Sequence, residues 1–300
     1  GLCLGLFSSS KLYLTGRPLG ISSILRSALQ KKRKDVSLLD WGVNLSFVLG
    51  FIAAALVAAI FHPHLLQPFP KNPTATPSWG GSVLWYLRIL GGGIVTGIGT
   101  TMSSGCTSGH GITGLSRFSL RSLVATCCFM TTAILAGTAM NVSRDFPKPE
   151  EGVAIANPEE SGSAYIALIV AAAVLLAASL PPLVLGDVDS YRVRAVRVYV
   201  VVFTCAFGFG SGLIVGGMAL PSKMAAFLDL RAWDPTLPFI MLGAHLVQTP
   251  AVQLAIEAAM TSQRPPPLGL LDAQGKHADC ASGNCGWSLK GVDTSRVDCR

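Results

Sequence analysis

Long apolar stretches separated by short polar ones run along most of the chain. A helix needs about 20 apolar residues to cross the hydrocarbon core of a bilayer. Four stretches reach that length with few or no charges: 41–61, 163–186, 198–218 and 236–256. Two more, 82–101 and 120–141, carry Arg88 and Arg121 near one end, where a long side chain reaches the headgroups. The pattern predicts an all-α polytopic membrane protein with about six full spans.

Glycine-rich polar segments interrupt this apolar pattern. They occupy residues 1–25, 93–118 and 208–230. The first two open alike, with Gly1/Gly5 matching Gly93/Gly97, and continue with Gly-Ile-Ser at 20–22 and Gly-Ile-Thr at 111–113. We interpret the segments as internal repeats that form re-entrant or broken short helices, because irregular backbone at membrane depth is tolerated where it lines a cavity.

Glycine has two uses in such segments. The GxxxG spacing of Gly93/Gly97 and of Gly208/Gly212 favours close packing of membrane helices. The glycines between 105 and 114 are different, because Ser, Thr, Cys and His accompany them and are too polar to be spacers. There we expect a binding site.

Composition agrees with a membrane protein: half of the residues are hydrophobic, 13% are charged and the mean hydropathy is +0.52. Basic residues gather at 26–34 and 192–197, which places these loops inside, whereas 62–81 and 142–162 are expected outside. The net charge of +7 therefore reflects topology, and we expect no nucleic-acid binding. The polar stretch 260–300 is expected to be a loop or tail, after a membrane domain over 1–259.

The run "GTTMSSGCTSGHGITGLSRFS" (99–119) carries hydroxyl and amide donors, while no carboxylate occurs between residues 41 and 144. Hydroxyls and helix N-termini attract negative charge without a formal cation. This inventory favours an anion as the ligand.

Cys106 is the nucleophile of the run, and His110 is expected to orient the loop by hydrogen bonding rather than act as a base. The alternative to a functional thiol is that Cys106 is a small buried side chain with a structural role only. Cys106 and His110 are four residues apart, but no second pair completes a metal site, so we expect no metal and no cofactor. We expect all cysteines to be free thiols. Cys127, Cys128 and Cys205 are expected to serve helix packing. His245 is expected to be a core histidine whose ring nitrogens are hydrogen-bonded.

Two motifs resemble the YeeE/YedE family of sulfur-transport membrane proteins. "SGCTSGHGITGLSRFSLRSLVATCCFM" (104–130) is similar to the family's Gly-Cys-Thr-Ser-Gly-His-Gly signature and its following helix. "GFGSGLIVGGMALPSKMAAFLDL" (208–230) is similar to its Gly-Met-x-x-Pro-x-Lys module. The likeness covers most of residues 1–259.

The resemblance implies uptake of thiosulfate or a related sulfur oxyanion past a cysteine at a constriction, with no enzymatic activity. The expected substrate path comprises Ser104, Cys106, Thr107, Ser108, Gly109, His110, Gly111, Gly217, Met218, Pro221 and Lys223. The first module differs from the family because "TGRPLGISSIL" lacks a cysteine and Cys3 lies too early. A last module, with Gly-Trp-Gly and Cys-Pro-Gly-Pro, is expected beyond a chain that we interpret as a fragment.

Two other functions stay open at this point. Cys106 could accept a sulfane sulfur as a persulfide and pass it to an intracellular acceptor protein, which would make the chain a membrane sulfurtransferase. The chain could also be a non-transporting membrane scaffold.

Overall fold

A computed structural model describes residues 1–16, 19–22, 24–25, 38–61, 79–103, 105–145 and 191–261, with the single positions 166, 170 and 174. All regular structure within these residues is helical, which confirms the all-α prediction. The helices are α1 (Leu2–Thr15), α3 (Leu38–Phe61), α4 (Trp79–Met102), the π-helix η2 (Gly109–Gly114), α5 (Leu120–Met140), α6 (Val142–Asp145), α8 (Tyr191–Val215), α9 (Pro221–Leu228) and α10 (Thr236–Thr261).

Helices long and apolar enough to cross a membrane lie where the sequence predicts them. Four such helices occur among the described residues: Trp41–Phe61, Leu120–Met140, Ala195–Val215 and Thr236–Glu257. Ile89–Met102 is a shorter apolar stretch within α4. Nearly all of the predicted span 163–186, and all but the first two residues of the predicted tail 260–300, lie outside the described residues. The protein is therefore an integral, multi-pass membrane protein, and the total of six spans stays a prediction.

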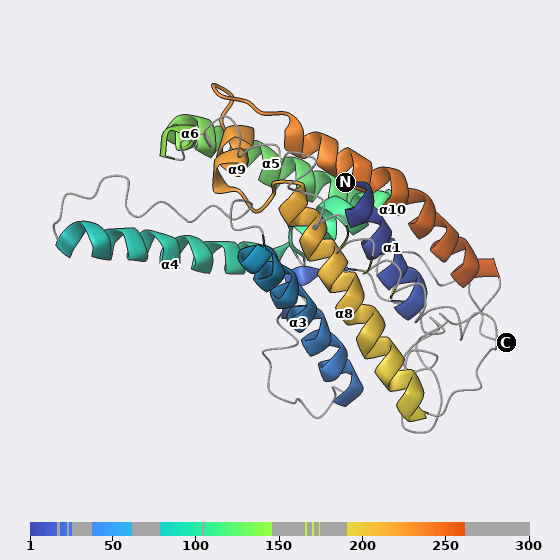
Figure 1. Cartoon of the computed structure of the whole chain (residues 1–300). Helices are drawn as coiled ribbons and strands as arrows, with labels where there is room; N and C mark the ends of the chain where they lie inside the picture. The colour runs from blue at the N-terminus through green and yellow to red at the C-terminus, as the bar shows by residue number, and fades with distance from the viewer. Residues whose placement is uncertain are drawn as a thin grey trace.

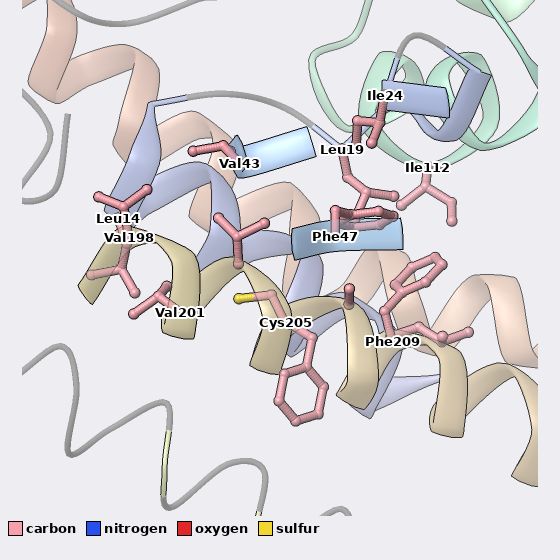
Figure 2. Close-up of a cluster of buried hydrophobic side chains, with 14 of the residues drawn as sticks. Leu14, Leu19, Ile24, Val43, Phe47, Ile112, Val198, Val201, Cys205 and Phe209 are labelled. Atoms are coloured by element: carbon pink, nitrogen blue, oxygen red, sulfur yellow. The ribbon is translucent and has the colours of Figure 1, made fainter. Parts of the chain in front are cut away.

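One main hydrophobic core joins most of the helices that surround α8. Figure 2 shows its side chains converging from α1, α3, α8, the π-helix and the segment after α1. The contributing residues include Leu14, Leu19, Ile24, Val43, Phe47, Ile112, Val198, Val201, Cys205 and Phe209. Cys205 is fully buried, as expected of a packing cysteine. Because Ile112 directly follows the predicted site residues His110 and Gly111, the core anchors the π-helix of that site to the bundle.

Glycines let α1 lie close to both of its neighbours. A Cβ atom at Gly208 of α8 would stand 2.3 Å from the ring of Phe7, and one at Gly212 would meet Leu4 at 3.1 Å. The packing prediction for Gly208/Gly212 is confirmed. On the other side of α1, a Cβ atom at Gly5 would lie 2.4 Å from the carbonyl oxygen of Ala244 in α10.

The order of these contacts gives the directions of the helices. Gly42 of α3 meets Tyr199 and Gly50 meets Phe203, so residue numbers rise together along α3 and α8, and these two helices are parallel. Both helices begin beside the basic stretches that place their N-terminal ends inside. The charge-based orientation and the packing therefore agree.

α4 and α5 are the least covered of the described helices. Figure 1 shows α4 extending away from the other helices, and an added Cβ atom at Gly93 or Gly97 would meet no described atom within 4 Å. Packing by Gly93/Gly97 stays a prediction. Cys127 and Cys128 are exposed on α5, so their assignment as packing residues is wrong within the described part of the chain.

We expect Gly5→Ala to lower the thermal unfolding temperature. The new methyl group would collide with the α10 backbone, and overpacking of this kind costs about 1–3 kcal/mol, which exceeds the gain of about 1 kcal/mol in helix propensity. Gly97→Ala is the matched control, because open space surrounds that position and only the propensity gain remains. An unfolding temperature that falls equally in both variants would contradict the seam between α1 and α10.

Candidate functional site

The polar run forms a break between two apolar helices, as the sequence predicts. α4 ends at Met102, the chain turns, and the π-helix Gly109–Gly114 leads to α5. Two glycines make room for the turn. A Cβ atom at Gly105 would stand 2.7 Å from Nε2 of His110, and one at Gly114 would stand 2.3 Å from Oγ of Ser122. Larger residues at these two positions would displace the polar side chains that hold the break together.

The sulfur atom of Cys106 lies among hydrogen-bond donors. Its Sγ is 3.0 Å from Oγ of Ser108. The hydroxyl and backbone N–H of Ser22, and the backbone N–H of Gly109, also interact with this sulfur. The side chain of Cys106 is part-buried, and it is not inert packing in an apolar pocket. Such a set of donors suits a negatively charged or electron-rich atom at this point.

His110 joins the two sides of the break. Its Nε2 is 3.2 Å from the carbonyl oxygen of Ser103, and its Nδ1 is 3.1 Å from Oγ of Ser122. A carbonyl can only accept, so Nε2 carries the proton and Nδ1 accepts from the Ser122 hydroxyl. The guanidinium of Arg121 donates to the same Ser103 carbonyl at 3.1 Å. Both ring nitrogens are thus engaged, as an orienting role requires.

Equivalent hydroxyl residues of the first two repeats both reach into the other repeat. Thr113 of Gly-Ile-Thr donates through Oγ1 to the carbonyl oxygen of Leu19 at 3.1 Å. Ser22 of Gly-Ile-Ser interacts with Cys106. Matching positions of the two segments therefore meet at one junction, while the repeat relationship itself stays a prediction.

α10 closes the other side of the π-helix. Nδ1 of His245 is 3.1 Å from Oγ of Ser116, and the amide of Gln253 donates to the Ser116 carbonyl at 3.1 Å. His245 is therefore hydrogen-bonded inside the helix pack, as predicted. Ser116 itself is fully buried. These contacts fix the end of the π-helix before the chain enters α5.

The third module forms its own local structure. Gly217 adopts a φ of 73°, a left-handed conformation that favours glycine, and the aliphatic stem of Lys223 lies against it. Pro221 begins α9, where a missing N–H costs nothing. Met218 packs against the main core, to which Ile112 of the π-helix also belongs. The place of Lys223 on the substrate path stays a prediction.

A carboxylate anchors the end of this module. Asp229 is buried and accepts hydrogen bonds from the hydroxyl of Ser143 and the backbone N–H of Arg231. The Ser143 hydroxyl first, and then the Arg231 N–H, stabilise the ionised carboxylate, so the pKa of Asp229 lies below its ordinary value. Thr138 of α5 bonds to both Leu228 and Leu230 in the same joint. Asp229 therefore joins the end of α9 to α5 and α6.

The remaining predicted site residues have less defined surroundings. Thr107 is exposed, a Cβ atom added at Gly111 would meet no described atom within 4 Å, and Ser104 lies outside the described residues. Sequence reasoning missed Ser22 and Ser122 as partners, and it counted Ser103 for its hydroxyl, whereas the Ser103 carbonyl binds His110. Only Ser22 carried a signal, through its place in the repeated Gly-Ile-Ser motif.

No cluster of three or more His, Cys, Asp or Glu residues that could hold a metal ion occurs in the residues that the structure describes. The five described cysteines are free thiols, as expected: Cys3, Cys106, Cys127, Cys128 and Cys205. The chemistry of the site therefore depends on the donors around the Cys106 thiol.

Comparison with known families matches two parts of the chain. Residues 3–135 match a family described as sulphur transport, and residues 197–291 match a family of unknown function, DUF6691. The first match contains the first two glycine-rich modules and the Cys106 site, and the second contains the third module.

Curated relatives are bacterial transporters. A probable transporter of Xylella fastidiosa (strain 9a5c) is 35% identical over 142 residues, which is 47% of this chain and 91% of the relative. A second one, from strain Temecula1, is 34% identical over the same length. The thiosulfate transporter TsuA of Spirochaeta thermophila is 32% identical over 83 residues, which is 28% of this chain and 22% of that protein. No solved structure matches the chain.

We expect His110→Ala to destabilise the protein by about 1–3 kcal/mol, because it leaves the buried hydroxyl of Ser122 without this partner. Thermal unfolding of the purified protein in detergent measures the effect. Thr101→Ala is the control, since its exposed hydroxyl bonds only to Gly97 in its own helix and its loss should change stability by less than about 0.5 kcal/mol. Equal stability of the two variants would show that His110 does not hold the break.

Proposed function

The chain belongs to the YeeE/YedE family of sulfur-transport membrane proteins, and on this premise we propose that it is a permease for thiosulfate or a closely related sulfur oxyanion. Transport of a sulfur-containing substrate is the function that its relatives support. The finer part of the proposal is that the substrate passes Cys106 at a constriction.

The donors around Cys106 are the observation that carries the proposal. Hydroxyl groups of Ser108 and Ser22 and two backbone N–H groups surround one part-buried sulfur. An incoming oxyanion can take over these donors, one after another, without any formal positive charge. Because Ser22 belongs to the first module and Ser108 to the second, the contact point lies at the junction of the repeats, where transporters of repeated architecture bind substrate.

Weak binding at this point favours passage. A thiol is a weak donor, and one hydrogen bond of ordinary strength contributes only about 1 kcal/mol. A permeating ion must bind well enough to enter and loosely enough to leave. The thiol of Cys106 meets this condition better than a fixed positive charge, which would hold a divalent anion too long.

We assign the remaining path to the other predicted residues. His110 holds the turn that presents Cys106 and the backbone around Gly109 and Gly111. Ser104 and Thr107 offer hydroxyl groups nearby in sequence. The third module supplies Gly217, Met218, Pro221 and Lys223, and the Lys223 ammonium would attract the anion at a second position on its way.

A membrane sulfurtransferase is the alternative that the same thiol allows. The Cys106 thiolate would attack the sulfane sulfur of thiosulfate, sulfite would leave with the electron pair of the broken S–S bond, and Cys106 would carry a persulfide. An intracellular sulfur-accepting protein would then remove that sulfur. Among the described neighbours only His110 could serve as an acid or base, and both of its ring nitrogens are already engaged.

Uptake of radiolabelled thiosulfate into cells or proteoliposomes that contain the full-length protein tests the permease directly. We expect Cys106→Ala to reduce uptake by roughly fivefold, the factor that corresponds to one lost hydrogen bond. The Cys127→Ala/Cys128→Ala double variant is the control, because these thiols are exposed on α5 and should leave uptake unchanged. Uptake that survives Cys106→Ala in full would remove the proposed role of the thiol. Absence of uptake by the unmodified protein would favour a scaffold.

Intact-mass spectrometry after exposure to thiosulfate separates the permease from the sulfurtransferase. A permease that contacts the anion through hydrogen bonds leaves Cys106 at its original mass. Addition of one sulfur atom to wild-type protein, absent from Cys106→Ala, would instead support persulfide chemistry.

A further inference from the structure

His245 is a titratable side chain beside the π-helix that the proposed path does not use. It belongs to α10, and between positions 236 and 256 it is the only residue whose side chain ionises. The side chain is half-buried, and it is directed at the π-helix, where it meets Ser116. Ionisable residues at membrane depth are expensive, and they commonly mark an ion or proton path.

The hydrogen bonds of Ser116 determine which nitrogen of His245 exchanges a proton. Oγ of Ser116 donates its one hydrogen to the carbonyl oxygen of Ile112 at 2.7 Å, and Nδ1 of His245 lies 3.1 Å from the same Oγ. The Ser116 oxygen therefore accepts from the imidazole, so Nδ1 carries the proton of the neutral ring. Nε2 is the nitrogen that takes up or releases the second proton.

The ring of His245 also reaches the expected substrate path. It interacts with the backbone carbonyl of Gly111. A Cβ atom added at Gly111 would meet no described atom within 4 Å, so the backbone stays accessible from another side. A positive charge on His245 would thus lie directly beside the backbone that the anion is expected to pass. His110 is less suited to take a proton, because its Nδ1 already accepts from the Ser122 hydroxyl.

The charge of the proposed substrate gives such a proton a use. The donors described around Cys106 are neutral hydroxyl and N–H groups, which bind an anion without balancing its charge. Moving an ion across a membrane potential costs free energy in proportion to its charge. A proton that binds together with a divalent anion lowers the charge that has to cross.

We infer that His245 binds a proton together with the oxyanion, so that protonation of Nε2 and anion binding beside Gly111 stabilise each other. The proton comes from the surrounding solution, and the N–H bond is the only bond formed. Such coupling is reciprocal, because an anion that favours the charged ring is itself bound more tightly by it. Histidine suits this role because its ordinary pKa, about 6.5, lies close to neutral pH. The inference rests on the proposed function, to which it adds the coupled ion.

Other ionisable groups lie on the elements packed against α10. Lys11 of α1 is directed at Phe47 of α3, and the Lys223 side chain of α9 lies against Gly217. The groups on and beside the π-helix are Cys106, His110 and Arg117. Lysine and arginine stay charged near neutral pH, so the groups beside the π-helix that compete with His245 for a proton are the Cys106 thiol and the His110 ring.

Calorimetric titration of the full-length protein in lipid nanodiscs with thiosulfate tests the coupling. Repeating the titration in buffers of different ionisation enthalpy counts the protons taken up per bound anion. For an ordinary histidine and a tenfold coupling, we expect uptake of about half a proton at about pH 7 and roughly sixfold tighter binding at about pH 6 than at about pH 8.

Two variants remove the titratable ring. His245→Asn keeps an amide that can donate in place of Nδ1, and His245→Gln is the second choice if the first variant does not fold. We expect either variant to bind thiosulfate without proton uptake and with an affinity that changes less than about twofold over the same pH range.

Gln253→Met is the matched control. It removes another hydrogen bond from α10 to Ser116 but no titratable group. We therefore expect Gln253→Met to retain the uptake of about half a proton, even where its affinity falls. Cys106→Ser separates the thiol from the histidine, and it should also retain the proton uptake.

Three results would overturn the inference. Wild-type protein that binds thiosulfate without taking up protons would remove the coupling and leave the permease proposal intact. Proton uptake that persists in the His245 variants, or that disappears in Cys106→Ser alone, would assign the proton to another group. Wild-type protein that binds no thiosulfate at any pH would remove the permease proposal and the coupling together.

Discussion

Non-helical backbone survives inside a hydrocarbon layer only where its amide and carbonyl groups find partners within the protein. In this chain that requirement falls on the turn between α4 and α5. His110 ties Ser103 on one side of the turn to Ser122 on the other, and α10 holds the far end of the π-helix through Ser116. Because of these bonds, the turn can present a thiol and several N–H groups while α4 and α5 remain helical on either side of it.

The close approach of α1 to α8 and α10 is the second condition, and glycine provides it. Because Gly5, Gly208 and Gly212 carry no side chain, α1 lies deep between its neighbours. The same depth buries Ser8 and Lys11, whereas at the lipid surface the long Lys11 side chain would extend toward the headgroups. Close packing and buried polarity are thus two results of one arrangement, and the loop after α1 is held where Ser22 meets Cys106.

The chemistry around Cys106 depends on both conditions. The turn presents the sulfur, and the neighbouring repeat contributes hydroxyl and N–H donors to it. The ligand that we propose for these donors is a negatively charged sulfur compound, in keeping with the sulfur-transport family of the chain. A covalent mechanism would need a free acid or base beside the thiol, whereas His110 is occupied in holding the turn.

The sequence by itself determined that the protein lies in a membrane, that it is helical and where the polar break falls, and it predicted the orientation of the helices. These properties depend on local hydropathy, glycine content and loop charge, all of which can be read from short stretches of the sequence. It also predicted a repeat in which Ser22 and Thr113 occupy matching positions. It could not show that Ser122 and Ser103 orient His110, or that Asp229 binds Ser143. Those contacts join residues far apart in the chain or on different helices, and only the rotation and register of packed helices, which hydropathy does not encode, decided which polar side chains meet.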